Sequence, residues 1–197
     1  GNGIFFNTKS DEEESSHVII RNSKIYGNGN PGSEFEHNLY IQVRRSLYEG
    51  NYIGQLVPGA QGSSLKDRSS GTVVRYNHID AAARALDLVE IEGGYVTDDP
   101  LYPYAWVYGN LIISDHSRKP RSSVLMIHWG GDNDPRYFRN GTLFFYNNTV
   151  KTAAAQKQYW YLSLFQMIDE KHIVDASYNV LLHEGTSEQY LGYDTGR

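Results

Sequence analysis

The chain has 197 residues, of which 40% are hydrophobic, and its formal net charge is −5 at pH 7. This length and composition suffice for one sizeable core, so we expect a single domain over residues 1–197. The negative net charge offers no basic field to nucleic acid, and no apolar run is long enough to span a membrane. The absence of cysteine excludes a disulfide framework and a thiolate metal site.

The first residues, 1–6, read as Gly-Asn-Gly-Ile-Phe-Phe, which is typical of a solenoid coil already under way. Solenoid ends normally carry a cap. We therefore expect native end caps to be missing from this sequence.

One short pattern then returns along the chain. An apolar strand is followed by asparagine, or once by serine, and an aliphatic residue comes two positions later. The anchor residues, 26 to 38 positions apart, are Ser23, Asn51, Asn77, Asn110, Asn148 and Asn179. Self-similarity at such a period indicates a solenoid.

A second strand-like stretch precedes most anchors, so each repeat is expected to hold two. These stretches alternate apolar and polar residues and are separated by Gly, Pro and Asn turns; they cover residues 38–43, 64–68, 85–90, 124–128 and 161–165. No segment shows a clear helical period. The pattern predicts an all-β fold, a right-handed parallel β-helix of about five to six coils. At its corners each asparagine is expected to bond to the next and to adopt the left-handed backbone of a tight bend.

Stacking the upstream strands predicts one exposed strip. If Leu39, Leu65, Leu86 and Leu125 point inward, their neighbours point outward on coils about 4.8 Å apart. These outward residues are Tyr40, Gln42, Lys66, Arg68, Asp87, Met126 and His128. Asp67 falls on the inward side, where an unpaired carboxylate is costly, so we expect it to be hydrogen-bonded in a bend or to mark an irregular strand.

This strip has two interpretations. A lysine crowded by an arginine has its ammonium form disfavoured, which suits a base. Alternatively, Lys66 and Arg68 pair with Asp87 in a solvated ion-pair ladder, and His128 packs beside Trp129 without a catalytic role.

Two insertions interrupt the coils. Residues 95–104 are acidic and aromatic, and residues 115–122 are basic. Insertions on one side of a solenoid commonly form groove walls, so Tyr102 and Tyr104 are expected to stack on sugar rings, unless the insertions only decorate the surface. Asp11–Glu14 and Gly131–Pro135 carry hard oxygen ligands that suit Ca²⁺, although a solvated loop and a turn are the favoured explanations; no other metal site is expected.

Several segments together resemble a known group of proteins. The chain resembles the bacterial right-handed β-helix proteins of the polysaccharide-lyase-like superfamily over about residues 17–182, in the segments Gly62–Ser69, Tyr76–Asp80, Ala85–Leu88, Gly93-Gly94, Tyr108–Asn110 and Tyr146–Thr149. The superfamily mixes lyases, hydrolases, epimerases and non-catalytic proteins. The resemblance implies a secreted, periplasmic or cell-surface protein whose partner is an acidic polysaccharide.

For a lyase, the resemblance implies a base within Lys66–Ser70, which makes Lys66 the base. The acid-donating arginine of these families belongs near Asp87, so Arg68 or Arg84 takes that role here. Asp87 and His128 are then supporting residues, and Tyr40 and Gln42 are substrate contacts.

Two other functions stay open. Hydrolysis needs opposed carboxylates, and Asp87 with Glu90 or Glu92 gives no opposed pair on one strand. The alternative to an enzyme is a non-catalytic carbohydrate-binding, structural or adhesion β-helix.

Overall fold

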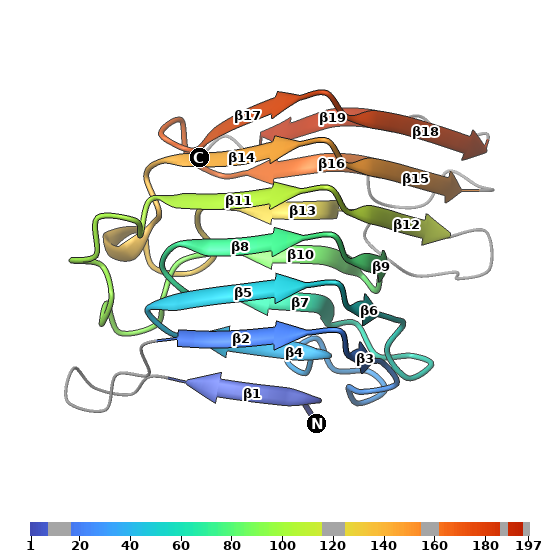
Figure 1. The fold of residues 1–197 in the computed structure, drawn as a ribbon, viewed down its shortest axis with the longest axis horizontal. Coiled ribbons are helices and arrows are strands. Elements are labelled where there is room, and N and C mark those ends of the chain that lie inside the picture. The colour runs from blue at the N-terminus through green and yellow to red at the C-terminus, as the bar shows by residue number, and fades with distance from the viewer. Residues whose placement is uncertain (8–16, 116–124, 155–161, 186–188, 195–197) are drawn as a thin grey trace.

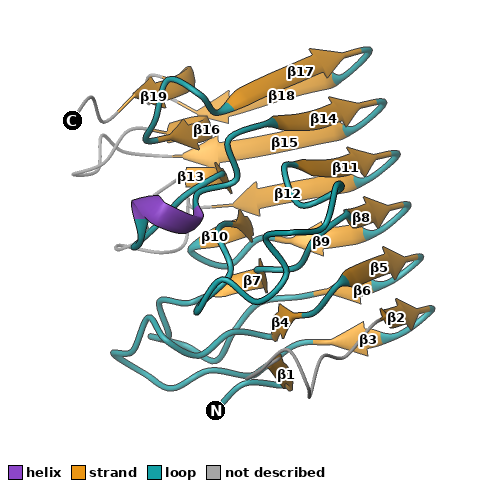
Figure 2. Ribbon diagram, turned by 90° about the vertical axis from the view of Figure 1, so that its left-hand side faces the viewer, coloured by secondary structure: helices purple, strands orange, loops and turns teal. Residues whose placement is uncertain are grey.

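Three parallel β-sheets wrap around one axis, along which the coils stack from bottom to top (Figure 1). The computed structural model describes residues 1–7, 17–115, 125–154, 162–185 and 189–194. Every strand pairs in parallel with the strand of the next coil in its own sheet, so the chain is a parallel β-helix. Figure 2 shows the coils stacked from the N-terminal to the C-terminal end.

We name the sheets A, B and C in the order in which each coil visits them. Sheet A contains β1 (Ile4–Asn7), β4 (Leu39–Gln42), β7 (Ser63–Asp67), β10 (Arg84–Leu88), β13 (Leu125–Trp129), β16 (Leu162–Met167) and β19 (Gln189–Asp194). Sheet B contains β2 (His17–Arg21), β5 (Arg45–Glu49), β8 (Thr72–Arg75), β11 (Tyr104–Tyr108), β14 (Thr142–Tyr146) and β17 (Ile173–Ser177). Sheet C contains β3 (Lys24–Ile25), β6 (Tyr52–Ile53), β9 (His78–Asp80), β12 (Leu111–Asp115), β15 (Thr149–Ala154) and β18 (Val180–Gly185).

Each coil therefore has three strands, whereas the sequence pattern predicted two. The downstream stretch divides at the recurrent asparagine into a strand of sheet B and a strand of sheet C. The corner at the asparagine was predicted, but the third strand was not, because the two arms of the corner together read as one apolar run. Among the described residues the only helix is a short 3₁₀ turn, η2 (Pro135–Tyr137).

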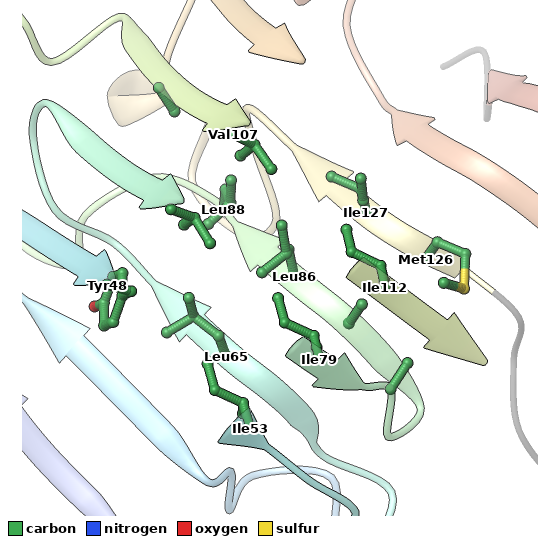
Figure 3. Packing of buried hydrophobic residues seen from close by; sticks show 14 of the residues in the cluster. Tyr48, Ile53, Leu65, Ile79, Leu86, Leu88, Val107, Ile112, Met126 and Ile127 are labelled. Atoms are coloured by element: carbon green, nitrogen blue, oxygen red, sulfur yellow. The ribbon is translucent and has the colours of Figure 1, made fainter. Parts of the chain in front are cut away.

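The interior consists of apolar ladders in register (Figure 3). In sheet C, Ile53, Ile79 and Ile112 lie on successive coils and are fully buried. In sheet A, Leu39 aligns with Leu65 and then with Leu86, as the alternation predicted. Each buried side chain of this size contributes about 1.5–3 kcal/mol. Columns of aliphatic residues thus support the register of sheets A and C.

The asparagine ladder forms the corner between sheets B and C. The side-chain amide of Asn77 donates to Asn110 Oδ1 at 3.0 Å and to the Tyr48 carbonyl at 2.9 Å. Asn77 Oδ1 accepts hydrogen bonds from the backbone N–H and from the side-chain amide of Asn51. The same contacts continue from Asn110 through Asn148 to Asn179, so the predicted ladder is confirmed.

The left-handed residue of this corner is not the asparagine but the residue before it. Positive φ angles of 50° to 66° occur on successive coils at Asn22, Gly50, Tyr76, Gly109, Asn147 and Tyr178. The expectation that the asparagine itself adopts this conformation was wrong. The asparagine keeps its side chain inside the corner, and the preceding residue makes the bend.

A buried ionic group closes the corner between sheets A and B. Asp67 is fully buried and accepts hydrogen bonds from Tyr48 Oη at 2.6 Å, Ser69 N at 2.8 Å and Thr72 Oγ1 at 2.6 Å. The buried Arg139 approaches its carboxylate at 3.6 Å. The sequence placed Asp67 inside and required such a bend, and the structure confirms it.

Candidate functional site

The outer face of sheet A carries a column of polar side chains in register. The strand pairing aligns Tyr40 with Lys66, Lys66 with Asp87, and Asp87 with His128. These are the outward neighbours that the alternation predicted, one from each of β4, β7, β10 and β13. The column continues to Gln166 on β16. We call Tyr40, Lys66, Asp87 and His128 the polar column.

Lys66 lies between two carboxylates. Its Nζ is 2.9 Å from Asp87 Oδ2 and 3.0 Å from Asp132 Oδ2. Burial opposes the charged form of Asp87, but the Lys66 ammonium and the hydrogen bond to His128 outweigh it and hold the pKa of Asp87 well below its usual value. Burial acts on Asp132 in the same way, and Lys66 again lowers its pKa. Both carboxylates are therefore ionised, and Lys66 is held as their shared donor.

The other oxygen of Asp87 orients His128. His128 Nδ1 is 2.9 Å from Asp87 Oδ1. Because an ionised carboxylate only accepts hydrogen bonds, this contact assigns a proton to Nδ1; in the neutral ring the lone pair is then on Nε2. Nε2 is buried and has no hydrogen-bond partner among the described residues. An imidazole held by a carboxylate, with its second nitrogen unengaged, is the arrangement of a general base.

Arg68 lies beside the column at the end of β7. Its Nη2 is 3.2 Å from Asp132 Oδ2, so Lys66 and Arg68 share one carboxylate. The proximity of Lys66 to Arg68 was expected to disfavour the ammonium; instead, a carboxylate lies between the two cations.

Glu90 fixes the turn that carries Asp132. Its buried carboxylate accepts the backbone N–H groups of Asp132, Asn133 and Asp134 at 2.6 to 2.9 Å. Glu90 thereby positions the turn in the loop between β13 and β14. Sequence reasoning missed this role, because nothing local to Glu90 indicates a turn more than 40 residues away.

Tyr40 and Gln42, expected as substrate contacts, contact the loop that follows β10. Tyr40 Oη donates to Glu92 Oε1 at 2.8 Å. Gln42 accepts the Glu92 backbone N–H at 2.9 Å and donates to Asn7 Oδ1 at 2.7 Å. Burial and Glu92 raise the pKa of Tyr40, so its hydroxyl stays a donor. Tyr40 and Gln42 thus connect the outer face of sheet A to this loop.

His37 is a member of the site that sequence reasoning passed over. Its ring lies 5.8 Å from the Tyr40 ring, and its Nδ1 accepts the Ser63 N–H at 2.8 Å. Burial lowers the pKa of His37 to about 4, and the nearby Lys66 ammonium adds to this effect. His37 is therefore neutral near pH 7, with its proton on Nε2. No metal-ligand spacing marks it in the sequence.

The remaining predicted residues do not gather at one place. Arg84 lies at the edge of the column, where its Nη1 is 3.5 Å from Asp87 Oδ2. Tyr102 is buried in a small second cluster, and its hydroxyl donates to the Tyr137 carbonyl at 2.6 Å. Tyr104 begins β11 and is exposed on sheet B. Met126, predicted on the outer face, packs with the hydrophobic core.

The sequence suggested two segments as Ca²⁺ sites, and the structure describes one of them. Asp11–Glu14 and most of the basic insertion lie outside the described residues. In the Gly131–Pro135 turn, Asp132 binds Lys66 and Arg68, and Asp134 binds Arg136 at 2.6 Å. These carboxylates neutralise cations of the chain itself, so the turn in this arrangement does not fit Ca²⁺. Within the described ranges, no group of three or more His, Asp or Glu side chains is placed to hold a metal ion.

Fold and site together define a parallel β-helix with a buried, charge-paired column on one sheet. No helix among the described residues is long and apolar enough to cross a membrane. Comparison of the chain with protein-family models, with curated proteins and with solved structures gave no match.

Proposed function

We propose that the chain is a right-handed β-helix of the polysaccharide-lyase-like superfamily that cleaves an acidic, uronate-containing polysaccharide by β-elimination. We place it in a secreted, periplasmic or cell-surface setting. One observation carries the proposal: the Asp87 carboxylate holds the His128 imidazole through Oδ1 and the Lys66 side chain through Oδ2. A proton acceptor and a proton donor are thus held side by side. The handedness follows the strong preference of parallel crossover connections.

The column supplies both proton transfers of the reaction. His128 Nε2 accepts the C5 proton, the electron pair of the C5–H bond forms the C4=C5 double bond, and the C4–O4 bond breaks. O4 takes a proton from Lys66 Nζ, and exchange with water restores both side chains. The base is thus assigned to His128 rather than Lys66, because an ammonium shared by two carboxylates is a donor.

The position of Asp132 supports a binding site for the uronate carboxylate. Its Oδ2 bridges Lys66 and Arg68, which is the contact that a substrate carboxylate needs. The side chain of Asp132 is 24% exposed, whereas those of Lys66 and Arg68 are 10% and 3% exposed. We expect the substrate carboxylate to displace the Asp132 carboxylate from Lys66 and Arg68 when the polysaccharide binds to the polar column.

A second function is favoured by a specific observation. His128 Nε2 is closed to solvent, and Lys66 and Arg68 both already contact carboxylates. A β-helix that binds an acidic polysaccharide without cleaving it needs no open base. The second candidate is therefore a carbohydrate-binding, structural or adhesion module.

One assay separates the two functions. The full chain is incubated with alginate, pectate and glycosaminoglycans, with EDTA and with Ca²⁺, while the ultraviolet absorbance of the unsaturated uronate is followed. Product from at least one polyuronate supports the lyase. Binding without product from any of them supports the second candidate and rejects the lyase.

A further inference from the structure

The outer face of sheet B has a step in side-chain size. The strand register aligns Ile19, Leu47, Val73, Trp106 and Phe144 on successive coils. The first three are aliphatic and the last two are aromatic. A shallow groove of about 440 Å³ lies along this step, within the range of small-ligand sites.

One wall of the groove consists of the aromatic rings of Trp106, Tyr108 and Tyr146. The Trp106 ring stacks on Phe144 at 5.7 Å and 17°. Its opposite face is turned toward β8, where the side chain of Val73 is too short to cover it. Tyr108 stacks on Tyr146 in the same way, at 4.9 Å and 4°. The face of Trp106 and the aliphatic side chains of Leu47 and Val73 form a shelf for a flat, largely apolar surface.

The ionisable side chains that give the groove its charge are two arginines and a histidine. Among the described residues these are His17, Arg45 and Arg75, and no described acidic residue lines the groove, although the chain as a whole has a net charge of −5. Glu49 and the hydroxyl of Tyr108 fix Arg75 in place, the latter at 3.0 Å. Ser70 and Asp99 fix Arg45. These contacts use three of the five N–H donors of Arg75 within the described part of the chain and leave two for a ligand.

We propose that this groove binds an acidic saccharide, with a sugar ring on the shelf of Trp106 and Val73 and its carboxylate or sulfate on the two remaining donors of Arg75. Sugar rings have apolar C–H faces that pack on aromatic rings. Guanidinium groups bind carboxylates and sulfates in bidentate form. The proposal rests on the groove alone and holds whether or not the polar column is catalytic.

An acidic peptide fits this groove less well. Peptides usually bind to sheets by pairing with the backbone of an edge strand. Here β5, β8 and β11 are each paired on both sides, so the groove offers side chains only. Binding by side chains alone favours a ligand with its own rigid ring and polar substituents.

The test is a titration of the full chain followed by the indole N–H signal of Trp106 in NMR, assigned with Trp106→Phe. The probes are a hexagalacturonate, a heparin hexasaccharide, maltohexaose and hexaglutamate. We expect a saturable shift with one or both acidic saccharides and none with maltohexaose or hexaglutamate. The proposal is overturned if neither acidic saccharide shifts the signal, or if maltohexaose or hexaglutamate binds as tightly.

Two variants and a matched control sharpen the result. Val73→Trp fills the groove and is expected to weaken binding more than tenfold, and Arg75→Gln about tenfold. Ile173→Trp, the same kind of change on an exposed position of sheet B outside the groove, should leave binding unchanged. Equal binding by Val73→Trp overturns the proposal, as does a dimer in solution that Val73→Trp dissociates. Formation of the elimination product is measured in parallel and tests the lyase activity of the polar column. Saccharide binding in the groove and lyase activity can therefore fail independently.

Discussion

At the scale of single residues, His37 makes the stability of the protein depend on pH. Its pKa is lowered from 6.5 to about 4 in the folded state. Between these values the unfolded chain binds a proton that the folded chain does not, so stability present above pH 6.5 is lost as the pH falls toward 4. The shift corresponds to about 3 kcal/mol.

His37→Gln is expected to flatten this part of the pH profile. The check is chemical denaturation of both proteins between pH 7 and pH 4. His172, whose pKa burial also lowers, contributes a further slope in the same direction, which both proteins retain. An identical slope in the two proteins would show that His37 is not buried as a neutral side chain.

Asp132 gives a second prediction at this scale, because its carboxylate occupies the proposed uronate position. Asp132→Asn removes the competing charge and keeps the backbone N–H that bonds to Glu90. We expect several-fold tighter binding of hexagalacturonate to the Lys66–Arg68 pair, measured by calorimetry. The control is Glu92→Gln, which also removes a carboxylate near Arg68, but an exposed one at 3.7 Å. This control should leave binding unchanged. Unchanged or weaker binding by Asp132→Asn would place the uronate elsewhere.

At the scale of the strands and corners, the asparagine ladder is the main determinant of coil stacking. Asn110→Ala removes the acceptor of the Asn77 N–H and the donor to the Val74 carbonyl. Each unsatisfied buried group costs about 1–3 kcal/mol, so we expect a loss of about 3 kcal/mol or more in the free energy of unfolding.

Ser23→Ala is the control for this substitution, because Ser23 holds the equivalent corner and its hydroxyl makes only an exposed bond to the Arg21 carbonyl. Urea denaturation should show a small change for Ser23→Ala and a large one for Asn110→Ala. Similar losses in both would mean that the apolar ladders, and not the amide ladder, hold the corner.

Much of the column and the ladder was predictable from sequence, because both depend on local alternation. Once Leu65 and Leu86 point inward, Lys66 and Asp87 must lie on the outer face, one coil apart. His37, Glu90 and Asp132 were not predictable in their roles. They lie in the irregular segments that flank β4, β10 and β13, and the sequence does not show which residues of neighbouring coils such segments contact.

At the scale of the whole molecule, the solenoid presents two faces of different character. Sheet A carries a charge-paired column that is almost closed to solvent, and sheet B carries an aromatic shelf with basic side chains. The alternation of Tyr104, Trp106 and Tyr108 was visible in the sequence. Its meaning was not, because the groove depends on the short side chains of the neighbouring coils.

The central claim is that the polar column performs a β-elimination with His128 as its base. The most direct test compares the initial rate of unsaturated product formation for the unaltered chain, His128→Gln and the exposed control Tyr178→Phe. We predict a loss of about 100-fold or more for His128→Gln, whose amide can still bond to Asp87, at an unfolding midpoint close to that of the parent. Tyr178→Phe should keep the full rate. Product formed by His128→Gln at the parent rate, or no product from the parent chain on any polyuronate, would contradict the account.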